Sequence, residues 1–264
     1  SRASMSAAAV VVASLALSGC TVGGGVLGSG LASPSPTATD IGDVVDLKPV
    51  AVTKQQLGRI IDRLDFRAFQ KNPKWLMGFS DITLLHNHIH RRYGISTLHA
   101  PMAAAFHPGK GKNENVQSLQ QALKGKKNNY RTNAHPQNKQ GKATGLLVGG
   151  NLAMLAHAIG TRSDIQTDGK ILLLEDVGEY LYNIDRLLQQ LKRAGKLKNL
   201  AGAVMGTFTD CKDTVRPFGQ TVTEIIQAAF SEYAYPLCFE FPVGHGTENR
   251  AVKLGIPYQL TVSK

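Results

Sequence analysis

The chain has 264 residues, of which 42% are hydrophobic and 19% charged, and its formal net charge is +11. At roughly 150 residues per domain, this length predicts one or two domains with a sizeable core and excludes a miniprotein held together by disulfides. The composition also excludes wholesale disorder and a polytopic membrane protein.

An apolar run at the amino terminus, Ala7 to Leu17, has the length of the hydrophobic segment of a secretory signal and is too short to span a bilayer comfortably. Leu17-Ser18-Gly19-Cys20 ends it and resembles the lipobox of bacterial lipoproteins, in which the cysteine receives the lipid. We therefore predict a signal-like segment over residues 1–20, lipidation of Cys20, and a lipoprotein anchored to the membrane of the cell envelope. The alternative is an apolar first strand or helix with a free cysteine, in a cytoplasmic protein.

A flexible tether is expected over residues 21–53. Its first part is rich in Gly, Ser, Thr and Pro and carries almost no charge, as in GGG at 23–25 and SPSP at 33–36. A lipid anchor followed by such a tether would let a folded body stand away from the membrane.

The folded body alternates strands with amphipathic helices, which predicts an α/β architecture with a largely parallel sheet. We expect two structured parts, residues 54–106 and 145–264. The expected elements are a helix around 54–64, a strand at 75–78, a helix from Asp81, a strand at 145–148, a helix from Leu152, a buried strand at 170–174, a helix over 181–191 ending near Gly195, a strand at 203–208, a helix over 222–230 and a strand at 237–241.

The segment between these two parts, residues 107–144, is expected to be a basic linker loop. Between His107 and Gly145 it carries eight lysines and arginines against the single acid Glu114, which places a net +7 in one polar stretch. We interpret this charge as a solvated loop and predict no nucleic-acid partner.

Three polar groups follow strands at the edge where open α/β sheets place their ligands. Ser80 lies in the turn GFSD, Glu175 follows the apolar strand 171–174, and His245 lies between glycines in GHG. The order nucleophile, acid, histidine is that of the α/β-hydrolases, although Ile82 stands where the G-x-S-x-G turn has its second glycine. The structural alternatives are a helix cap for Ser80, an ion-pairing acid for Glu175 and an exposed loop histidine for His245.

A serine held at a helix amino terminus also leaves the backbone N–H of the next residue facing a developing negative charge. We therefore predict the N–H of Asp81 as an oxyanion donor, assisted by the helix dipole.

The combination of GFSD, LLLEDVGE with a following YNIDR, GTFTDC and PVGHGTEN in this order strongly resembles the LD-carboxypeptidase family of serine peptidases, which includes muramoyltetrapeptide carboxypeptidase. The motifs LDF at 64–66, HAPM at 99–102 and GGN at 149–151 match as well, and the similarity runs from about Gly58 to Val262. The resemblance implies Ser80 as nucleophile, His245 as base and Glu175 as the acid that orients it. It also implies a partial parallel-sheet nucleophile domain followed by a carboxyl-terminal α/β domain that supplies the glutamate and the histidine.

The function implied by the resemblance is a carboxypeptidase that cleaves the L,D-peptide bond to a terminal D-amino acid of murein-type peptides in peptidoglycan turnover. Gly149, Gly150 and Asn151 are expected to bind substrate, no metal or organic cofactor is required, and a homodimer is compatible with the family. Two alternatives stay open: a lipid-tethered homologue that binds peptidoglycan without turnover, and a hydrolase of peptide-nucleotide antibiotics that confers self-immunity.

The chain departs from the family upstream of the GFSD turn. Members of the family usually have further strand and helix units there and a glycine-rich RGGYG turn, whereas this chain has the signal-like run, the tether and QQLG at 55–58. We therefore expect a truncated or replaced amino-terminal domain and the loss of one oxyanion donor.

Other conspicuous residues have structural explanations. His86 and His90 share a helix face, but no third ligand stands at a suitable spacing, so we predict no metal site. Cys211 and Cys238 are expected to be buried thiols.

Overall fold

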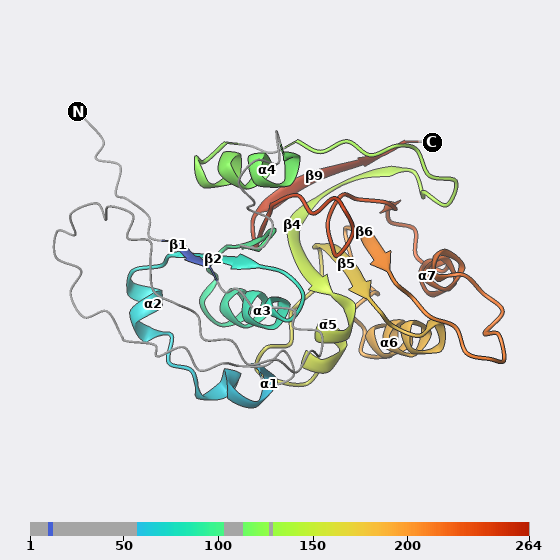
Figure 1. Ribbon diagram of the computed structural model, residues 1–264, viewed down its shortest axis with the longest axis horizontal. Helices are drawn as coiled ribbons and strands as arrows, with labels where there is room; N and C mark the ends of the chain where they lie inside the picture. The colour runs from blue at the N-terminus through green and yellow to red at the C-terminus, as the bar shows by residue number, and fades with distance from the viewer. Residues whose placement is uncertain (1–9, 13–56, 103–112, 127–128, 264) are drawn as a thin grey trace, which may run out of the picture.

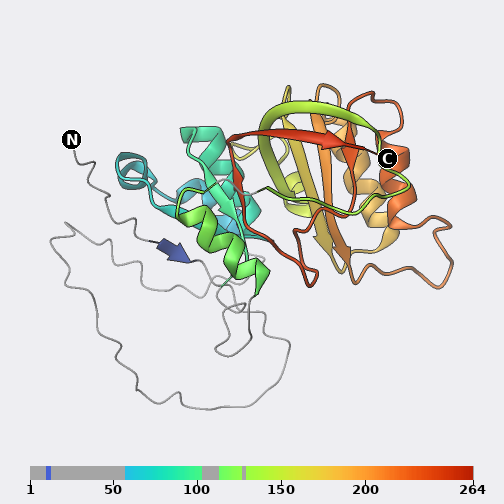
Figure 2. The ribbon, with the colours of Figure 1, turned by 90° about the horizontal axis from the view of Figure 1, so that it is seen from above.

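The computed structural model describes residues 10–12, 57–102, 113–126 and 129–263. In this part the chain forms two sheets with helices packed against them (Figure 1). Figure 2 shows the two halves side by side, with the amino-terminal strands and helices next to the larger second sheet. The predicted α/β class with parallel strands is confirmed. The tether and Cys20 lie outside the described residues.

The first sheet has the strand order β1-β2-β3-β8. Strand β2 pairs in parallel with β1 and β3, and β8 runs antiparallel to β3. The carboxyl-terminal part of the chain therefore completes the sheet of the amino-terminal part, which the division at residue 145 did not foresee. The strands are β1 (Val10–Val12), β2 (Trp75–Gly78), β3 (Thr97–His99) and β8 (Val252–Leu254).

Strand β1 lies inside the apolar run Ala7–Leu17. Its three valines pair in register with Trp75, Leu76 and Met77 of β2. This is the arrangement expected from the alternative of an apolar first strand at this position.

Helices cover both faces of the first sheet. Successive strand residues point to opposite faces, so Leu76 packs with α3 while Met77 packs with α4. Gly94 has a left-handed φ of 66° and ends α3, as a helix C-terminal glycine should. The helices are α1 (Leu57–Ile60), continued by a 3-10 turn (Ile61–Arg63), α2 (Arg67–Lys71), α3 (Ile82–Tyr93) and α4 (Glu114–Leu123).

The prediction of a basic loop over residues 107–144 is wrong for two of its segments. Helix α4 occupies the middle, capped by Asn113, whose side chain accepts a hydrogen bond from Asn115 N, and strand β4 begins at Gly141. The prediction failed because the lysines lie on either side of this helix and made the whole segment look like a solvated loop. The helix itself buries Leu119 and Ala122 against the first sheet. Charge at the ends of a short amphipathic helix does not prevent the helix.

The second sheet has the order β7-β6-β5-β4-β9 and is parallel except for β9. The long strand β4 pairs with β9 through its first half and with β5 through Leu147–Asn151. Strand β7 is shorter than the predicted 237–241, and β8 and β9 were not predicted. The strands are β4 (Gly141–Asn151), β5 (Ile171–Val177), β6 (Gly202–Thr209), β7 (Leu237–Cys238) and β9 (Pro257–Val262).

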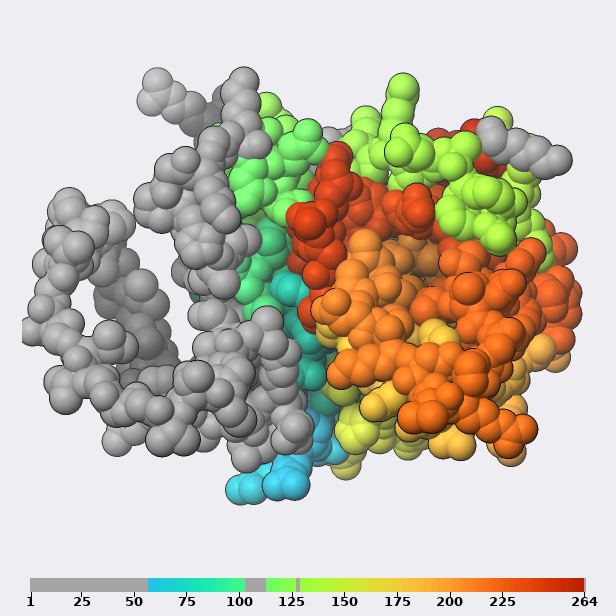
Figure 3. Space-filling view, turned by 45° about the vertical axis from the view of Figure 1, so that its right-hand side comes forward, coloured from blue at the N-terminus to red at the C-terminus, as the bar shows by residue number. Residues whose placement is uncertain are grey.

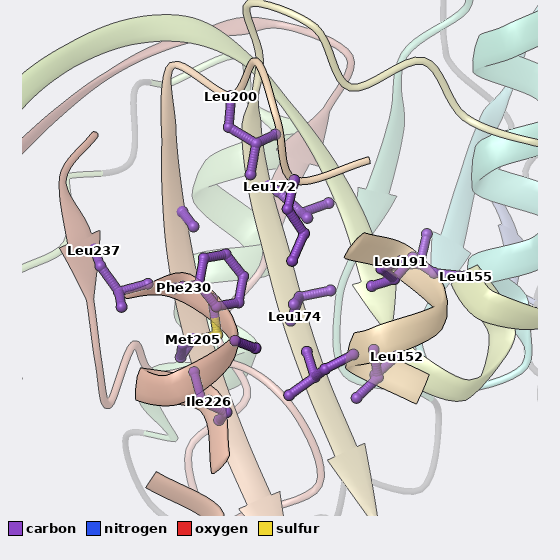
Figure 4. Packing of buried hydrophobic residues seen from close by; sticks show 14 of the residues in the cluster. Leu152, Leu155, Leu172, Leu174, Leu191, Leu200, Met205, Ile226, Phe230 and Leu237 are labelled. Carbon is purple, nitrogen blue, oxygen red and sulfur yellow. The ribbon is translucent and has the colours of Figure 1, made fainter. Parts of the chain in front are cut away.

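The largest core lies between the second sheet and three helices (Figure 4). Leu172 and Leu174 of β5 point into it, whereas Leu173 points to the opposite face and packs with Val243. Each fully buried leucine contributes about 2 kcal/mol of transfer free energy, so this core fixes the ends of the strands firmly. The helices are α5 (Leu152–Ala158), α6 (Leu181–Arg193) and α7 (Val222–Phe230).

Among the described residues, no helix has the length and apolarity needed to cross a bilayer. Cys238 is buried and Cys211 half-buried, and both are free thiols. Burial raises the pKa of Cys211 to about 11, so this thiol stays protonated at neutral pH.

Candidate active site

Ser80 lies in a sharp turn between β2 and α3. Its φ is 61°, one of three positive values among the described non-glycine residues. A residue forced into this region costs about 1–2 kcal/mol, and such strain is concentrated at functional positions. Gly78 permits the turn, because a Cβ there would approach Ile82 Cγ1 to 2.9 Å. Ser80 thus follows the carboxyl end of β2, as predicted, and its side chain is buried there.

The helix after Ser80 is joined firmly to this turn. Thr83 N donates to Ser80 O at 3.0 Å, and His86 Nε2 donates to Gly78 O at 3.0 Å. Asp81 is the N-terminal cap residue of α3, with helical φ and ψ. Its N–H as oxyanion donor stays a prediction.

The prediction that Glu175 follows its strand is wrong: Glu175 lies within β5 and is fully buried. The pairing of β5 with β6 shifts between Leu174 and Asp176, a bulge that changes where side chains point. The Glu175 side chain leaves on the face where Leu173 packs with Val243, because a Cβ placed on Gly206 would meet both Val243 and Glu175 Cβ. Gly206 of β6 gives it room, since a Cβ there would come within 3.1 Å of Glu175 Cβ.

The loop carrying His245 is held on both sides. Thr207 Oγ1 donates to Val243 O and accepts from Gly246 N, both at 3.2 Å. On the other side, Gly244 N donates to Asn249 Oδ1 at 3.3 Å. Gly244 has a φ of 122°, and a Cβ there would meet Thr207 Oγ1 at 2.4 Å. These contacts hold the His245 loop against β6 and fix its turn.

His245 and Glu175 form a pair, with 2.8 Å between His245 Nδ1 and Glu175 Oε2. An ionised carboxylate only accepts, so Nδ1 carries the hydrogen and Nε2 is left to accept a proton. Phe79, the residue before Ser80, packs edge-on against His245 with 4.7 Å between ring centroids. The structure therefore brings His245, Glu175 and the serine turn together.

Of the two hydrogen bonds that the predicted triad needs, the one between Ser80 and His245 is not formed. Nε2 of His245 is buried and has no hydrogen-bond partner among the described residues. Catalytic hydrogen bonds are often long without substrate and tighten when substrate binds.

Gly149, Gly150 and Asn151 join the serine helix to the second sheet. Asn151 N donates to Thr83 Oγ1 at 3.0 Å, and a Cβ on Gly150 would meet that same oxygen at 2.5 Å. The Asn151 side chain accepts from Met154 N to cap α5 and donates to Asp176 Oδ1 at 2.9 Å. The contact of Gly149, Gly150 and Asn151 with substrate stays a prediction; the contacts that the structure shows for them are structural.

Asp176 was not singled out by the sequence, although it lies in the same motif as Glu175. Its carboxylate accepts from Asn151 Nδ2, Ala153 N and Val177 N. Burial nevertheless raises its pKa to about 6. Asp176 thus connects β5 with α5, directly behind the His245–Glu175 pair.

The histidines of α3 serve packing in this structure. Burial lowers the pKa of His86 to about 4, and His88 Nδ1 lies 2.9 Å from Ser163 Oγ. In the described part of the chain, no group of three or more His, Cys, Asp or Glu side chains is placed to hold a metal ion.

His99 on β3 is also fully buried, with its ring 5.9 Å from Phe79. Its pKa falls to about 3, chiefly through burial and also through the neighbouring His86 and His245. His86 and His99 therefore stay neutral in the folded protein well below pH 6.5.

These two histidines predict a loss of stability in acid. As the pH falls from 6.5 to 5, these two histidines bind protons in the unfolded chain but stay neutral in the folded chain. The free energy of unfolding should therefore fall by about 2 kcal/mol per histidine. Urea unfolding followed by Trp75 fluorescence at pH 7.5 and 5.0 measures the loss, and His99→Asn should reduce it by about 2 kcal/mol. Burial also lowers the pKa of His88 and of His90, and these two add to the loss equally in both proteins. The raised pKa of Asp176 makes the folded chain more stable as the pH falls, and this contribution is the same in the native chain and in His99→Asn. An unchanged pH dependence in His99→Asn would contradict the assignment.

In the comparison with known proteins, two domains of one family match the two parts of the chain separately. The LD-carboxypeptidase N-terminal domain matches residues 55–100, and the LD-carboxypeptidase C-terminal domain matches residues 144–260. Together these segments contain Ser80, Glu175 and His245.

Two curated relatives carry related names. The chain is 35% identical over 206 residues to the probable murein peptide carboxypeptidase of Bacillus subtilis, a match that covers 75% of this chain and 63% of the relative. It is 33% identical over 212 residues to the murein tetrapeptide carboxypeptidase of Pseudomonas aeruginosa, covering 75% of this chain and 66% of the relative. The chain thus spans just under two thirds of these relatives.

Solved structures share the fold. Muramoyltetrapeptide carboxypeptidase from Oxalobacter formigenes superposes with a TM-score of 0.69 at 26% identity, over 78% of this chain and 71% of that one. The self-immunity protein MccF in its wild-type apo state gives 0.65 at 20% identity, over 76% and 69%, a likeness that concerns the fold alone.

Proposed function

Because the chain belongs to the LD-carboxypeptidase family, we propose that it is a serine carboxypeptidase that removes a terminal D-amino acid from murein-type peptides. The bond cleaved is the L,D-peptide bond to that residue. The names of the relatives support murein peptides as the substrate class.

The chemistry assigns one step to each residue. Ser80 Oγ attacks the scissile carbonyl carbon while His245 Nε2 takes its proton, and His245 then returns the proton to the leaving amine. Water hydrolyses the acyl-serine by the same path. Glu175 holds the imidazole in the tautomer with hydrogen on Nδ1 and stabilises its charged form. The Asp81 N–H faces the developing oxyanion.

The observation that carries the proposal is the His245–Glu175 pair at 2.8 Å, placed beside the strained serine turn by Phe79. A capping serine needs no strained φ, and an ion-pairing acid need not be fully buried against one histidine. Both structural alternatives explain less of the geometry than a triad does.

The test is release of the terminal D-alanine from a murein tetrapeptide by the full chain, measured by chromatography of the shortened peptide product. We expect turnover of this peptide and none of the same peptide ending in L-alanine. Binding of the tetrapeptide without D-alanine release would favour the non-catalytic alternative. Hydrolysis of an aminoacyl sulfamoyl adenosine alone would favour the self-immunity alternative.

We also propose that Cys20 is lipidated and anchors the protein to a membrane. The proposal rests on Leu17-Ser18-Gly19-Cys20. Cleavage before Cys20 would remove Val10–Val12, which pair with β2 as β1. Retention of β1 and lipidation of Cys20 therefore exclude each other.

Expression of the full chain in a bacterial host with labelled fatty acid decides between them. We expect label in the membrane fraction, and none in Cys20→Ser. Cys211→Ser is the matched control and should keep the label. Equal solubility of the native chain and Cys20→Ser, with residues 10–12 present by mass spectrometry, would overturn the lipid anchor.

A further inference from the structure

Helix α4 contacts the loop that carries His245. The side chain of Asn115, in the first turn of α4, makes two hydrogen bonds to this loop. Its Nδ2 donates to Thr247 O at 3.0 Å, and its Oδ1 accepts from Asn249 N at 2.9 Å. Figure 3 shows α4, in green, against the carboxyl-terminal part of the chain, in red. The two bonds join residues that are 132 and 134 positions apart in the sequence.

An asparagine side chain suits this contact. One amide supplies a donor and an acceptor side by side, and the loop presents a backbone carbonyl and a backbone N–H two residues apart. An ionised aspartate accepts but cannot donate, so it would make only the bond from Asn249 N. Both bonds of Asn115 go to the loop backbone, so they act on the position of the loop as a whole.

The hydrogen bonds continue from Asn249 to the residue before His245. Asn249 Oδ1 accepts from Gly244 N at 3.3 Å. Gly244 directly precedes His245, and Thr247 follows it by two residues. Asn115 therefore holds the loop on both sides of the imidazole in the sequence.

Helix α4 is fixed to the sheet that carries the serine turn. Leu119 of α4 packs in one buried cluster with Met77 of β2, which lies three residues before Ser80. Ala251 belongs to the same cluster, and its N donates to Ser118 Oγ at 2.8 Å. The loop with the proposed base is therefore tied through α4 to the sheet with the proposed nucleophile.

The proposed triad needs such a connection because its members come from two sheets. Ser80 follows β2 of the first sheet, whereas Glu175 lies in β5 of the second. His245 is already paired with Glu175, and its Nε2 has no hydrogen-bond partner among the described residues. The distance from Nε2 to Ser80 therefore depends on how the loop is held relative to the first sheet.

We propose that Asn115 is a positioning residue, which holds the His245 loop so that Nε2 reaches Ser80 when substrate binds. The inference rests on the proposed function and adds to it a residue outside the triad, which acts through the backbone of the loop. A shift of about 1 Å in a catalytic group can lower a rate about 100-fold, so the loss of two hydrogen bonds to this loop is enough for a large effect.

Asn115→Ala removes both hydrogen bonds and should still fold, because alanine has the higher helix propensity. We expect kcat for the murein tetrapeptide to fall at least about tenfold while KM stays within about twofold, because a displaced base slows the chemistry without removing a contact to the peptide. Gln120→Ala, exposed on the same helix, is the matched control and should keep the native kcat and KM. Rates are measured well below the melting temperature of each variant. A native kcat in Asn115→Ala, with or without a lower melting temperature, would overturn the inference.

The rate at which a fluorophosphonate labels Ser80 separates this inference from the proposed function, since it reports the activation of Ser80 without any peptide. We expect Asn115→Ala to be labelled at least about tenfold more slowly than the native chain, and Gln120→Ala at the native rate. If this holds while no tetrapeptide is hydrolysed, the proposed function fails and the role of Asn115 stands. Equal labelling of the native chain and Asn115→Ala would overturn the inference even if the tetrapeptide is hydrolysed. A native chain that is not labelled at Ser80 would overturn both.

Discussion

Ser80→Ala should abolish release of D-alanine from a murein tetrapeptide, with a fall in kcat of about 10⁴ or more. The substitution removes the nucleophile and leaves the turn intact, because serine and alanine pay a similar penalty for the φ of 61° at this position. Initial rates with saturating peptide measure the loss, and thermal unfolding checks the fold.

Ser231→Ala provides the control for this substitution. Ser231 is exposed at the end of α7, where its hydroxyl donates to Ala228 O, and it takes no part in the proposed triad or in the contacts that hold the His245 loop. This variant should keep native turnover. Undiminished D-alanine release by Ser80→Ala would contradict the assignment of the nucleophile.

Glu175→Ala and His245→Ala should each lower kcat nearly as far as Ser80→Ala. His245→Ala removes the base, and Glu175→Ala leaves His245 Nδ1 without its carboxylate at 2.8 Å. Members of a triad fail together, so Ser80→Ala/His245→Ala should be no slower than the slower single variant. Steady-state rates of the three single variants and the double variant test this non-additivity.

Two further variants separate chemistry from folding. Glu175→Gln keeps the volume and one acceptor oxygen but loses the charge, so its rate should lie between native and Glu175→Ala. Glu232→Ala, which breaks an exposed ion pair with Lys192, should keep native turnover. Rate losses that simply add across the triad would show that the residues do not act as one unit.

The sequence predicted those elements whose pattern is local. Strand β2 and helix α7 have the predicted boundaries, because the four-residue run 75–78 is bounded by turns and the apolar residues of 222–230 repeat at helical spacing. Helix α4 was missed because lysines on either side of it hide a short apolar stripe. Strand β8 was missed because it completes the sheet formed by β2 and β3, a pairing across more than 150 residues that no local pattern records.

In the candidate site too, local motifs were predictable from the sequence, whereas contacts between distant segments were not. Ser80, Glu175 and His245 each stand in a recognisable motif, and the structure places His245 beside Glu175 and Phe79. The groups that hold them there were not identified individually. Thr207 and Asn249 lie inside quoted motifs, but their roles depend on contacts of the His245 loop with β6 and across its own turn. Composition and spacing carry no information on such contacts.

In the proposed mechanism, His245, oriented by Glu175, activates Ser80. Intact-mass analysis after treatment with a fluorophosphonate, which reacts with activated serines, tests this most directly. We expect one adduct on the native chain, mapped by peptide digestion to Ser80, none on Ser80→Ala, and labelling of His245→Ala slowed by about 10³ or more. A native chain that remains unlabelled, or a His245→Ala variant labelled at the native rate, would contradict the account.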